Sequence, residues 1–173
     1  MIDFSKNYFA LFDLQPNFQI DSARLEHNYR ALQAQVHPDK FSSASEAQRR
    51  VSMQSSTYVN EAYQTLKIPL NRARYLLSLH GVDTQEETNT AMPPLFLMEQ
   101  MEWREAISEA SQVTVLEQLA SKLGQSIQQL LSEVGEHLDQ QQDYVAAAEA
   151  VRKLRFFDKL REEINDALEV LET

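Results

Sequence analysis

Apolar residues recur at helical spacing through most of the chain. In the first half, a run with steps of three and four residues comprises Leu25, Tyr29, Leu32 and Val36. Such steps place side chains on one face of a helix. Asp21 before the run is a suitable N-cap, and Pro38 after it disfavours helical geometry at His37. The pattern therefore predicts a long helix that starts after Asp21 and ends near residue 36 or 37.

A second long helix is predicted after a polar connector. Its apolar positions are Val51, Tyr58, Val59, Ala62, Tyr63 and Leu66. The segment Ser43–Glu46 matches a capping box at the start of this helix, and Pro69 ends it. Shorter helices are expected in residues 7–14 and 69–81. Two long helices joined in this way are expected to pack antiparallel, with the connector exposed at one tip.

The second half of the chain shows three more helical patterns, of which the first extends from Leu95 to about Ala110. The second has apolar residues at Leu116, Leu119, Leu123, Ile127, Leu130, Val134 and Leu138. The third has them at Ala147, Val151, Leu154, Phe157, Leu160, Ile164, Leu168 and Leu171. A three-helix bundle is the simplest way to bury three such stripes. Residues 81–94 lack periodicity and form the expected boundary, so the sequence predicts an all-α protein in two parts.

The helix that begins near Leu95 has more apolar residues than one buried face requires. One narrow stripe comprises Phe96, Trp103, Ile107 and Ala110. A second group, about 100–200° around the helix, comprises Leu97, Met98, Met101, Glu102 and Glu105. Phe156 likewise lies off the stripe of the last helix, within the basic run RKLRFFDKLR. Two interpretations stay open: an exposed binding patch, for which methionine is well suited, or packing between the two parts.

The basic run around Phe156 stands out in an acidic chain. We interpret it as an ion-pairing surface that faces the glutamates of the helix beginning near Leu95, because charge runs are usually solvated faces. The formal net charge of −10 argues against a protein that neutralises nucleic-acid phosphates or binds anionic membranes. The absence of cysteine excludes disulfides and thiolate chemistry. Neither a signal peptide nor a membrane span is predicted, so the expected location is the cytoplasm.

The connector between the two long helices contains His37, Pro38, Asp39 and Lys40. His37 and Asp39 could serve as a base and its orienting carboxylate in a small hydrolase, but the sequence specifies no nucleophile beside them. A metal site would need three or four converging ligands. The sequence thus predicts no catalytic residue, no metal and no cofactor. An exposed imidazole, carboxylate and ammonium group suit docking to another protein, and a loop of chance composition is the alternative.

Three segments in order resemble the J-domain, a helical hairpin that activates heat-shock-70-class ATPase chaperones. They are YFALFDL, LEHNYRALQAQVHPDKF and VNEAYQTLKIPLNRARYLL, and the resemblance covers about residues 4–76. The later segments FLMEQMEWRE and RKLRFFDKLR extend the resemblance over the whole chain to one family, the HscB co-chaperones of iron–sulfur cluster assembly. The resemblance implies a non-enzymatic protein with a J-domain at 1–76, a connecting segment at 77–93 and a three-helix bundle at 94–173, arranged in an L shape.

The resemblance also implies roles for individual residues. Those that would dock an HscA-type ATPase chaperone are His37, Pro38, Asp39, Lys40, Tyr29 and Arg30. Those that would bind the IscU-type scaffold protein, on which the cluster is built, are Leu97, Met98, Met101, Glu102, Glu105 and Phe156. Ala31, Gln33 and Gln35 make this helix less basic than in general J-domains, which fits a dedicated chaperone, and service to a general chaperone with other clients is the alternative. The chain has no cysteine-rich metal-binding segment, so a bacterial-type member is expected.

Overall fold

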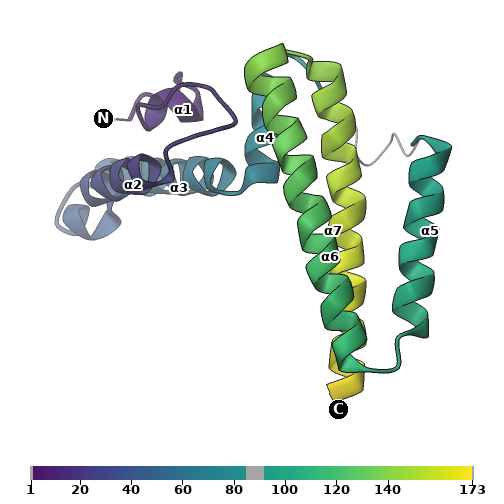
Figure 1. The fold of residues 1–173 in the computed structure, drawn as a ribbon. Helices are drawn as coiled ribbons and strands as arrows, with labels where there is room; N and C mark the ends of the chain where they lie inside the picture. Colours follow the sequence, from purple (N-terminus) through teal and green to yellow (C-terminus); the bar gives the residue numbers. More distant parts are fainter. Residues whose placement is uncertain (1, 85–91, 173) are drawn as a thin grey trace. The chain divides into compact units, whose positions relative to one another are not determined.

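The computed structural model describes residues 2–84 and 92–172, which form helices and no strands (Figure 1). The prediction of an all-α fold is therefore confirmed. The chain divides into two compact units, Met1–Leu79 and His80–Thr173. None of the helices in the described part combines the length and the apolar character that a bilayer crossing requires.

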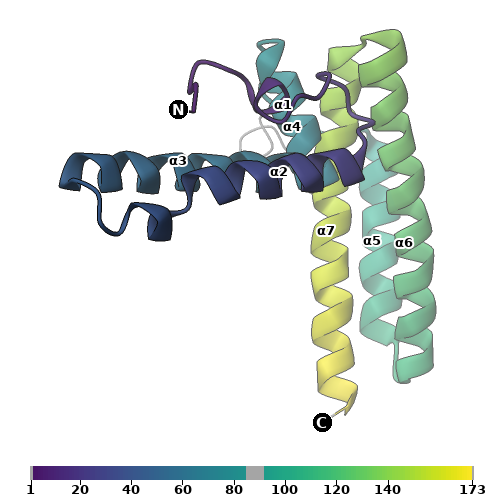
Figure 2. The same ribbon diagram turned by 90° about the vertical axis from the view of Figure 1, so that its left-hand side faces the viewer.

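The first unit is a helical hairpin with short flanking helices. In chain order its elements are α1 (Tyr8–Leu11), α2 (Ser22–Val36), the 3₁₀ turn η1 (Pro38–Phe41), α3 (Glu46–Lys67) and α4 (Pro69–Leu79). The helices α2 and α3 lie side by side in both views, with η1 at the tip where the chain reverses (Figures 1 and 2). Asp21 caps α2 as predicted, since its carboxylate accepts from the backbone N–H of Arg24 at 3.0 Å.

The predicted cap of α3 is wrong by two residues. The N-cap is Ser45, whose hydroxyl accepts from the backbone N–H of Gln48 at 3.3 Å, and the Gln48 side chain accepts in return from the N–H of Ser45 at 3.1 Å. Ser43 and Glu46 fit the same motif in sequence, but the chain still turns at Ala44, whose N–H donates to the carbonyl of Phe41 at 3.0 Å. The helix therefore begins only at Glu46.

The substitution Ser45→Ala is expected to lower the free energy of unfolding by about 1 kcal/mol, because the N–H of Gln48 loses its acceptor. Ser43→Ala is the matched control and is expected to have no effect, because Ser43 does not cap the helix. Urea unfolding followed by circular dichroism measures both values. Equal losses in the two variants would contradict the assignment of the cap.

A second correction concerns the inner side of α3. Val51 was expected in the core but is 45% exposed, whereas Ser52 and Ser55 are 4% exposed. The Ser52 hydroxyl donates to the carbonyl of Val36 at 2.6 Å. This bond satisfies one of the carbonyls that the end of α2 leaves without a helical partner. A short polar side chain is therefore favoured where the hairpin helices meet near the tip.

The buried side chain of Arg72 joins three parts of the first unit. From α4, its guanidinium donates to the carbonyl of Phe18 at 2.7 Å and to the carbonyl of Leu66 at 2.6 Å. It also lies 5.0 Å from the centroid of the Phe18 ring. Since both carbonyls lie outside α4, these contacts fasten the loop before α2 and the end of α3 to α4.

The second unit contains the three predicted helices. They are α5 (Pro94–Glu109), α6 (Val113–Gly135) and α7 (Tyr144–Glu172), with a π-helical turn η2 (Glu136–Gln141) after α6. The helices α6 and α7 lie side by side (Figures 1 and 2). The ring of Phe96 on α5 meets the rings of Phe156 and Phe157 on α7 at centroid distances of 5.6 and 5.8 Å. Leu138 is buried although it lies in η2, beyond the end of α6.

The segment predicted as the boundary, residues 81–94, lies partly outside the described residues. The described residues before the gap contact α7, and those after it lead into α5. The carbonyl of Thr84 accepts from Arg152 at 3.2 Å, and Pro94 begins α5. Gly81, at φ +72°, adopts the left-handed conformation in which glycine ends a helical segment without strain.

The net charge is divided unequally between the two units. The first contains nine Lys and Arg against seven Asp and Glu, which gives +2. The second contains seven against nineteen, which gives −12. The acidic character inferred from the whole chain is thus a property of the second unit. The two units offer partners opposite electrostatic surroundings.

Candidate functional site

The turn at the hairpin tip has a defined backbone. The helix α2 ends at Val36, and His37 has φ −58° and ψ 128°, the extended geometry that a following proline favours. Pro38 then begins η1, where its missing N–H costs nothing. The backbone N–H of Asp39 donates to His37 Nδ1 at 3.3 Å. The turn is therefore ordered by its own residues.

This bond also bears on what His37 can do. With Nδ1 accepting, the neutral ring carries its proton on Nε2, so the 3.5 Å approach of Nδ1 to Asp39 Oδ2 is not that of a base oriented by a donated proton. The side chains of His37 and Asp39 are 53% and 90% exposed. Within the described residues, no three His, Asp or Glu side chains are placed to hold a metal ion. An exposed pair of this kind suits recognition of a partner surface better than chemistry.

Tyr29 and Arg30 both lie on α2, where Tyr29 faces α3 and the Arg30 side chain is exposed. The Tyr29 ring stacks on Tyr63 at a centroid distance of 3.9 Å, and its hydroxyl donates to Asn60 Oδ1 at 2.9 Å. Arg30 Nε donates to Glu26 Oε1 at 2.8 Å. The hydroxyl of Tyr63 donates to the other oxygen of Glu26. Of the residues predicted to dock the chaperone, these two are thus held by hydrogen bonds, while Lys40 stands in η1 and is exposed.

The carboxylate of Glu26 accepts hydrogen bonds from both Arg30 and Tyr63. The hydrogen bond from Tyr63 and then that from Arg30 lower the pKa of Glu26 below its ordinary value, so the carboxylate stays ionised. The same bond to Glu26 raises the pKa of Tyr63. The sequence pattern does not mark Glu26, Asn60 or Tyr63 as site residues. The four-residue spacing of Glu26 and Arg30 predicts an ion pair on a helix. The contacts across to α3 leave no pattern in the sequence.

The helix α5 carries an exposed apolar surface. Leu97, Met98 and Met101 are 40%, 58% and 71% exposed, whereas Trp103 and Ile107 are buried. The predicted stripe therefore faces inward, and the residues outside it stay accessible in the second unit. Glu102 and Glu105 are exposed on the same helix. We call these five side chains, Leu97, Met98, Met101, Glu102 and Glu105, the α5 face.

Phe156 contacts this helix through its aromatic ring. Its half-buried ring meets Phe96 of α5 edge to face, at 90° between the ring planes. Phe96 directly precedes Leu97 in the chain. The fold thus brings Phe156 from α7 toward the helix that carries the α5 face, although the two segments are about 60 residues apart in sequence.

The expected pairing of the basic run with the glutamates of α5 is wrong. Lys153 pairs with Glu149 at 2.9 Å within α7. Arg161 pairs with Asp158 at 3.6 Å, also within α7. An ion pair that does join the two helices has the reverse polarity, Arg104 on α5 with Glu163 on α7 at 3.1 Å. In the part of the chain that the structure describes, no ion pair joins Glu102 or Glu105 to the basic run.

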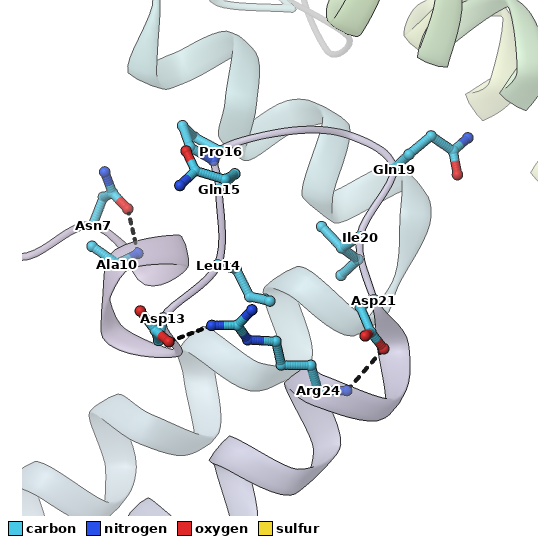
Figure 3. Close-up of a pocket in the computed structure, with 10 residues that line it drawn as sticks. All are labelled: Asn7, Ala10, Asp13, Leu14, Gln15, Pro16, Gln19, Ile20, Asp21 and Arg24. Carbon is cyan, nitrogen blue, oxygen red and sulfur yellow. Dashed lines mark hydrogen bonds and ion pairs between the residues drawn. The ribbon is translucent and has the colours of Figure 1, made fainter.

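A hollow of about 550 Å³ opens where the chain passes from α1 to α2 (Figure 3). Its charged and capping groups are satisfied by one another. Arg24 pairs with Asp13, Asp21 caps α2, and Asn7 accepts from the N–H of Ala10 at 2.9 Å (Figure 3). None of the predicted site residues lines this hollow. Its polar groups stabilise the connection between α1 and α2.

An ordered, exposed turn in the first unit and an exposed apolar helix face in the second define a protein that binds other proteins. Comparison with known sequences is more specific. Residues 92–165 match the family described as the HSCB C-terminal oligomerisation domain. The co-chaperone protein HscB homolog of Chromobacterium violaceum is 53% identical over 98% of this chain and 97% of its own. That of Azoarcus sp. (strain BH72) is 49% identical over 99% and 98%.

Solved structures give the same result. The chaperone HscB from Vibrio cholerae superposes with a TM-score of 0.84 at 38% identity, covering 96% of this chain and 99% of that one. Human co-chaperone HscB superposes with a TM-score of 0.91 at 36% identity, covering 99% of this chain and 85% of that one. The chain belongs to the HscB co-chaperone family. Its relatives are named co-chaperones, in agreement with the prediction that it is not an enzyme.

Proposed function

We propose that this protein is an adaptor of iron–sulfur cluster assembly, which stimulates ATP hydrolysis by an HscA-type chaperone and delivers an IscU-type scaffold protein to it. The observation that carries this proposal is the His-Pro-Asp turn. It is exposed and internally ordered at the tip of the α2–α3 hairpin, in a chain that belongs to the HscB family. Residues 1–76 would act as the J-domain, 77–93 as the connection and 94–173 as the scaffold-binding part.

The chaperone would dock on the turn and on the adjoining face of α2. The contact residues would be His37, Pro38, Asp39, Lys40, Tyr29 and Arg30. Because the turn is fixed by its proline and by the bond from Asp39 to His37, little ordering entropy is lost on binding. Acceleration of ATP hydrolysis would come from a shift in the conformational populations of the chaperone.

The scaffold would bind the α5 face together with Phe156. Exposed leucine and methionine side chains provide an adaptable apolar contact, and Glu102 and Glu105 add negative charge beside it. The complementary surface is therefore apolar with basic residues around it. Because one chain carries both sites, a bound scaffold is presented to the chaperone at a raised effective concentration. We place this activity in the cytoplasm, as for a bacterial-type member.

The proposal predicts a saturable rise in the steady-state ATPase rate of a purified HscA-type chaperone as this protein is added. Adding the IscU-type scaffold is expected to raise the rate further, because both partners then act on the chaperone together. Phosphate release measures both rates. A general heat-shock-70-class chaperone from the same source is the comparison. Equal stimulation of the two would favour a J-protein with other clients, and no stimulation of either would refute the proposal.

A further inference from the structure

The outer face of the hairpin contains a carboxylate held by two helices. Glu26 lies on α2 and accepts from Arg30 Nε at 2.8 Å on one oxygen, within the same helix. Its second oxygen accepts from the hydroxyl of Tyr63, which lies on α3. Each carboxylate oxygen therefore has a charged or hydroxyl donor. An ordinary exposed pair at this spacing lacks the second anchor.

Neighbouring side chains fix Tyr63 in turn. Its ring stacks on Tyr29 with 12° between the ring planes, and the ammonium of Lys67 lies 5.3 Å from its centroid. The Tyr29 hydroxyl and the Gln33 amide both donate to the same oxygen of Asn60. The network thus continues along the hairpin from Lys67 toward the tip. Its members have little freedom to turn away when a partner approaches.

The network changes the charge that this face offers to a partner. The Arg30 side chain is 76% exposed, yet a carboxylate lies 2.8 Å from its guanidinium. A partner surface rich in carboxylates would be attracted by Arg30 and repelled by Glu26, so the two effects would largely cancel. The other polar positions of α2 toward the tip include Gln33, which is uncharged. Discrimination between similar partners often depends on groups that disfavour the wrong one.

We propose that Glu26, positioned by Tyr63, is a specificity-determining residue that masks the charge of Arg30 and so disfavours chaperones that dock through a strongly acidic surface. This inference rests on the proposed function of the docking turn and names what selects its partner. Tyr63 is a positioning residue, because it acts through Glu26. The low pKa of Glu26 agrees with a carboxylate that stays charged in this role.

The test is Glu26→Gln in the full chain, in ATPase titrations of the HscA-type chaperone and of a general heat-shock-70-class chaperone at low and high salt. The concentration for half-maximal stimulation of the general chaperone is expected to fall about threefold to fivefold, the effect of one exposed charge near a partner. Its salt dependence is expected to steepen, because Arg30 becomes an unpaired charge. Tyr63→Phe is expected to shift both quantities in the same direction by less.

The matched control is Glu46→Gln. It removes the same charge and the same kind of pair, since Glu46 lies 3.5 Å from Arg50 four residues later on α3, outside the network. In this control, the ratio of the half-maximal concentrations for the two chaperones is expected to stay at its wild-type value. An equal shift in both variants would assign the effect to net charge and overturn the inference. An unchanged ratio and salt slope in Glu26→Gln, with wild-type stimulation intact, would also overturn it.

One further outcome separates the two proposals. If the wild-type chain stimulates neither chaperone, the proposed function fails, and the selectivity inference falls with it. If it stimulates the HscA-type chaperone and Glu26→Gln alone shifts the ratio, both stand. Circular dichroism spectra and melting curves of each variant show that the helices are retained, so that a loss of fold is not mistaken for a change of partner.

Discussion

His37→Gln is expected to abolish stimulation of the chaperone ATPase. The ring of His37 accepts the N–H of Asp39 and so orders the turn, and its exposed edge is available to the chaperone. Loss of a side chain at the centre of an interface typically costs about 2 kcal/mol or more, roughly a thirtyfold loss in affinity, so stimulation is expected to vanish at concentrations that half-saturate the wild type. Titration of the chaperone ATPase with the variant measures this loss. Since the proposed scaffold site lies in the other unit, scaffold binding measured by calorimetry is expected to be unchanged.

The matched control for this variant is His27→Gln. His27 is also exposed on α2 and undergoes the same chemical change, but it lies outside the turn. Wild-type stimulation is expected from it. Because His37 orders only a short exposed turn, the melting temperature of His37→Gln is expected to remain close to that of the wild type. Normal stimulation by His37→Gln would show that the docking assignment is wrong.

The triple substitution Leu97→Ala, Met101→Ala and Phe156→Ala is expected to weaken scaffold binding by a hundredfold or so, because two or more buried anchors typically contribute about 3 kcal/mol together. Leu97 and Met101 are 40% and 71% exposed, so their truncation removes little from the core. Phe156 loses its contact with Phe96, which costs about 1 kcal/mol of stability. Isothermal titration calorimetry with the purified scaffold measures the affinity, and circular dichroism shows whether the helices persist.

A control triple exists within the same unit. Val115, Val145 and Val170 are 38%, 76% and 75% exposed and lie on α6 and α7. Their replacement by alanine removes exposed apolar surface elsewhere and is expected to leave scaffold affinity unchanged. The α5-face variant is also expected to stimulate the chaperone normally when scaffold is absent. Wild-type affinity in the α5-face variant, with helical content preserved, would refute the scaffold site.

The two sites differ in how far the sequence alone could define them. The turn is local, because Pro38 fixes the backbone next to His37 and the residues that order it are neighbours in sequence. The α5 face is visible in the sequence only because Leu97, Met98 and Met101 do not fit the apolar stripe that is buried. The link from Phe156 to Phe96 joins two helices and has no signature in the spacing of residues.

The sequence by itself determined the helices, most of their ends and the residues of the turn. Apolar periodicity, the Asp21 cap and the prolines depend only on residues close in sequence, so they can be recognised without the tertiary structure. The cap of α3 is ambiguous in the sequence, because Ser43–Glu46 and Ser45–Gln48 both fit a capping box, and the local turn at Ala44 selects Ser45. Only the tertiary structure exposed Val51 and buried Ser52. It alone placed Glu26 beside Tyr63. Each of these depends on how one helix is rotated against another, which the packing of the whole unit sets and local spacing does not.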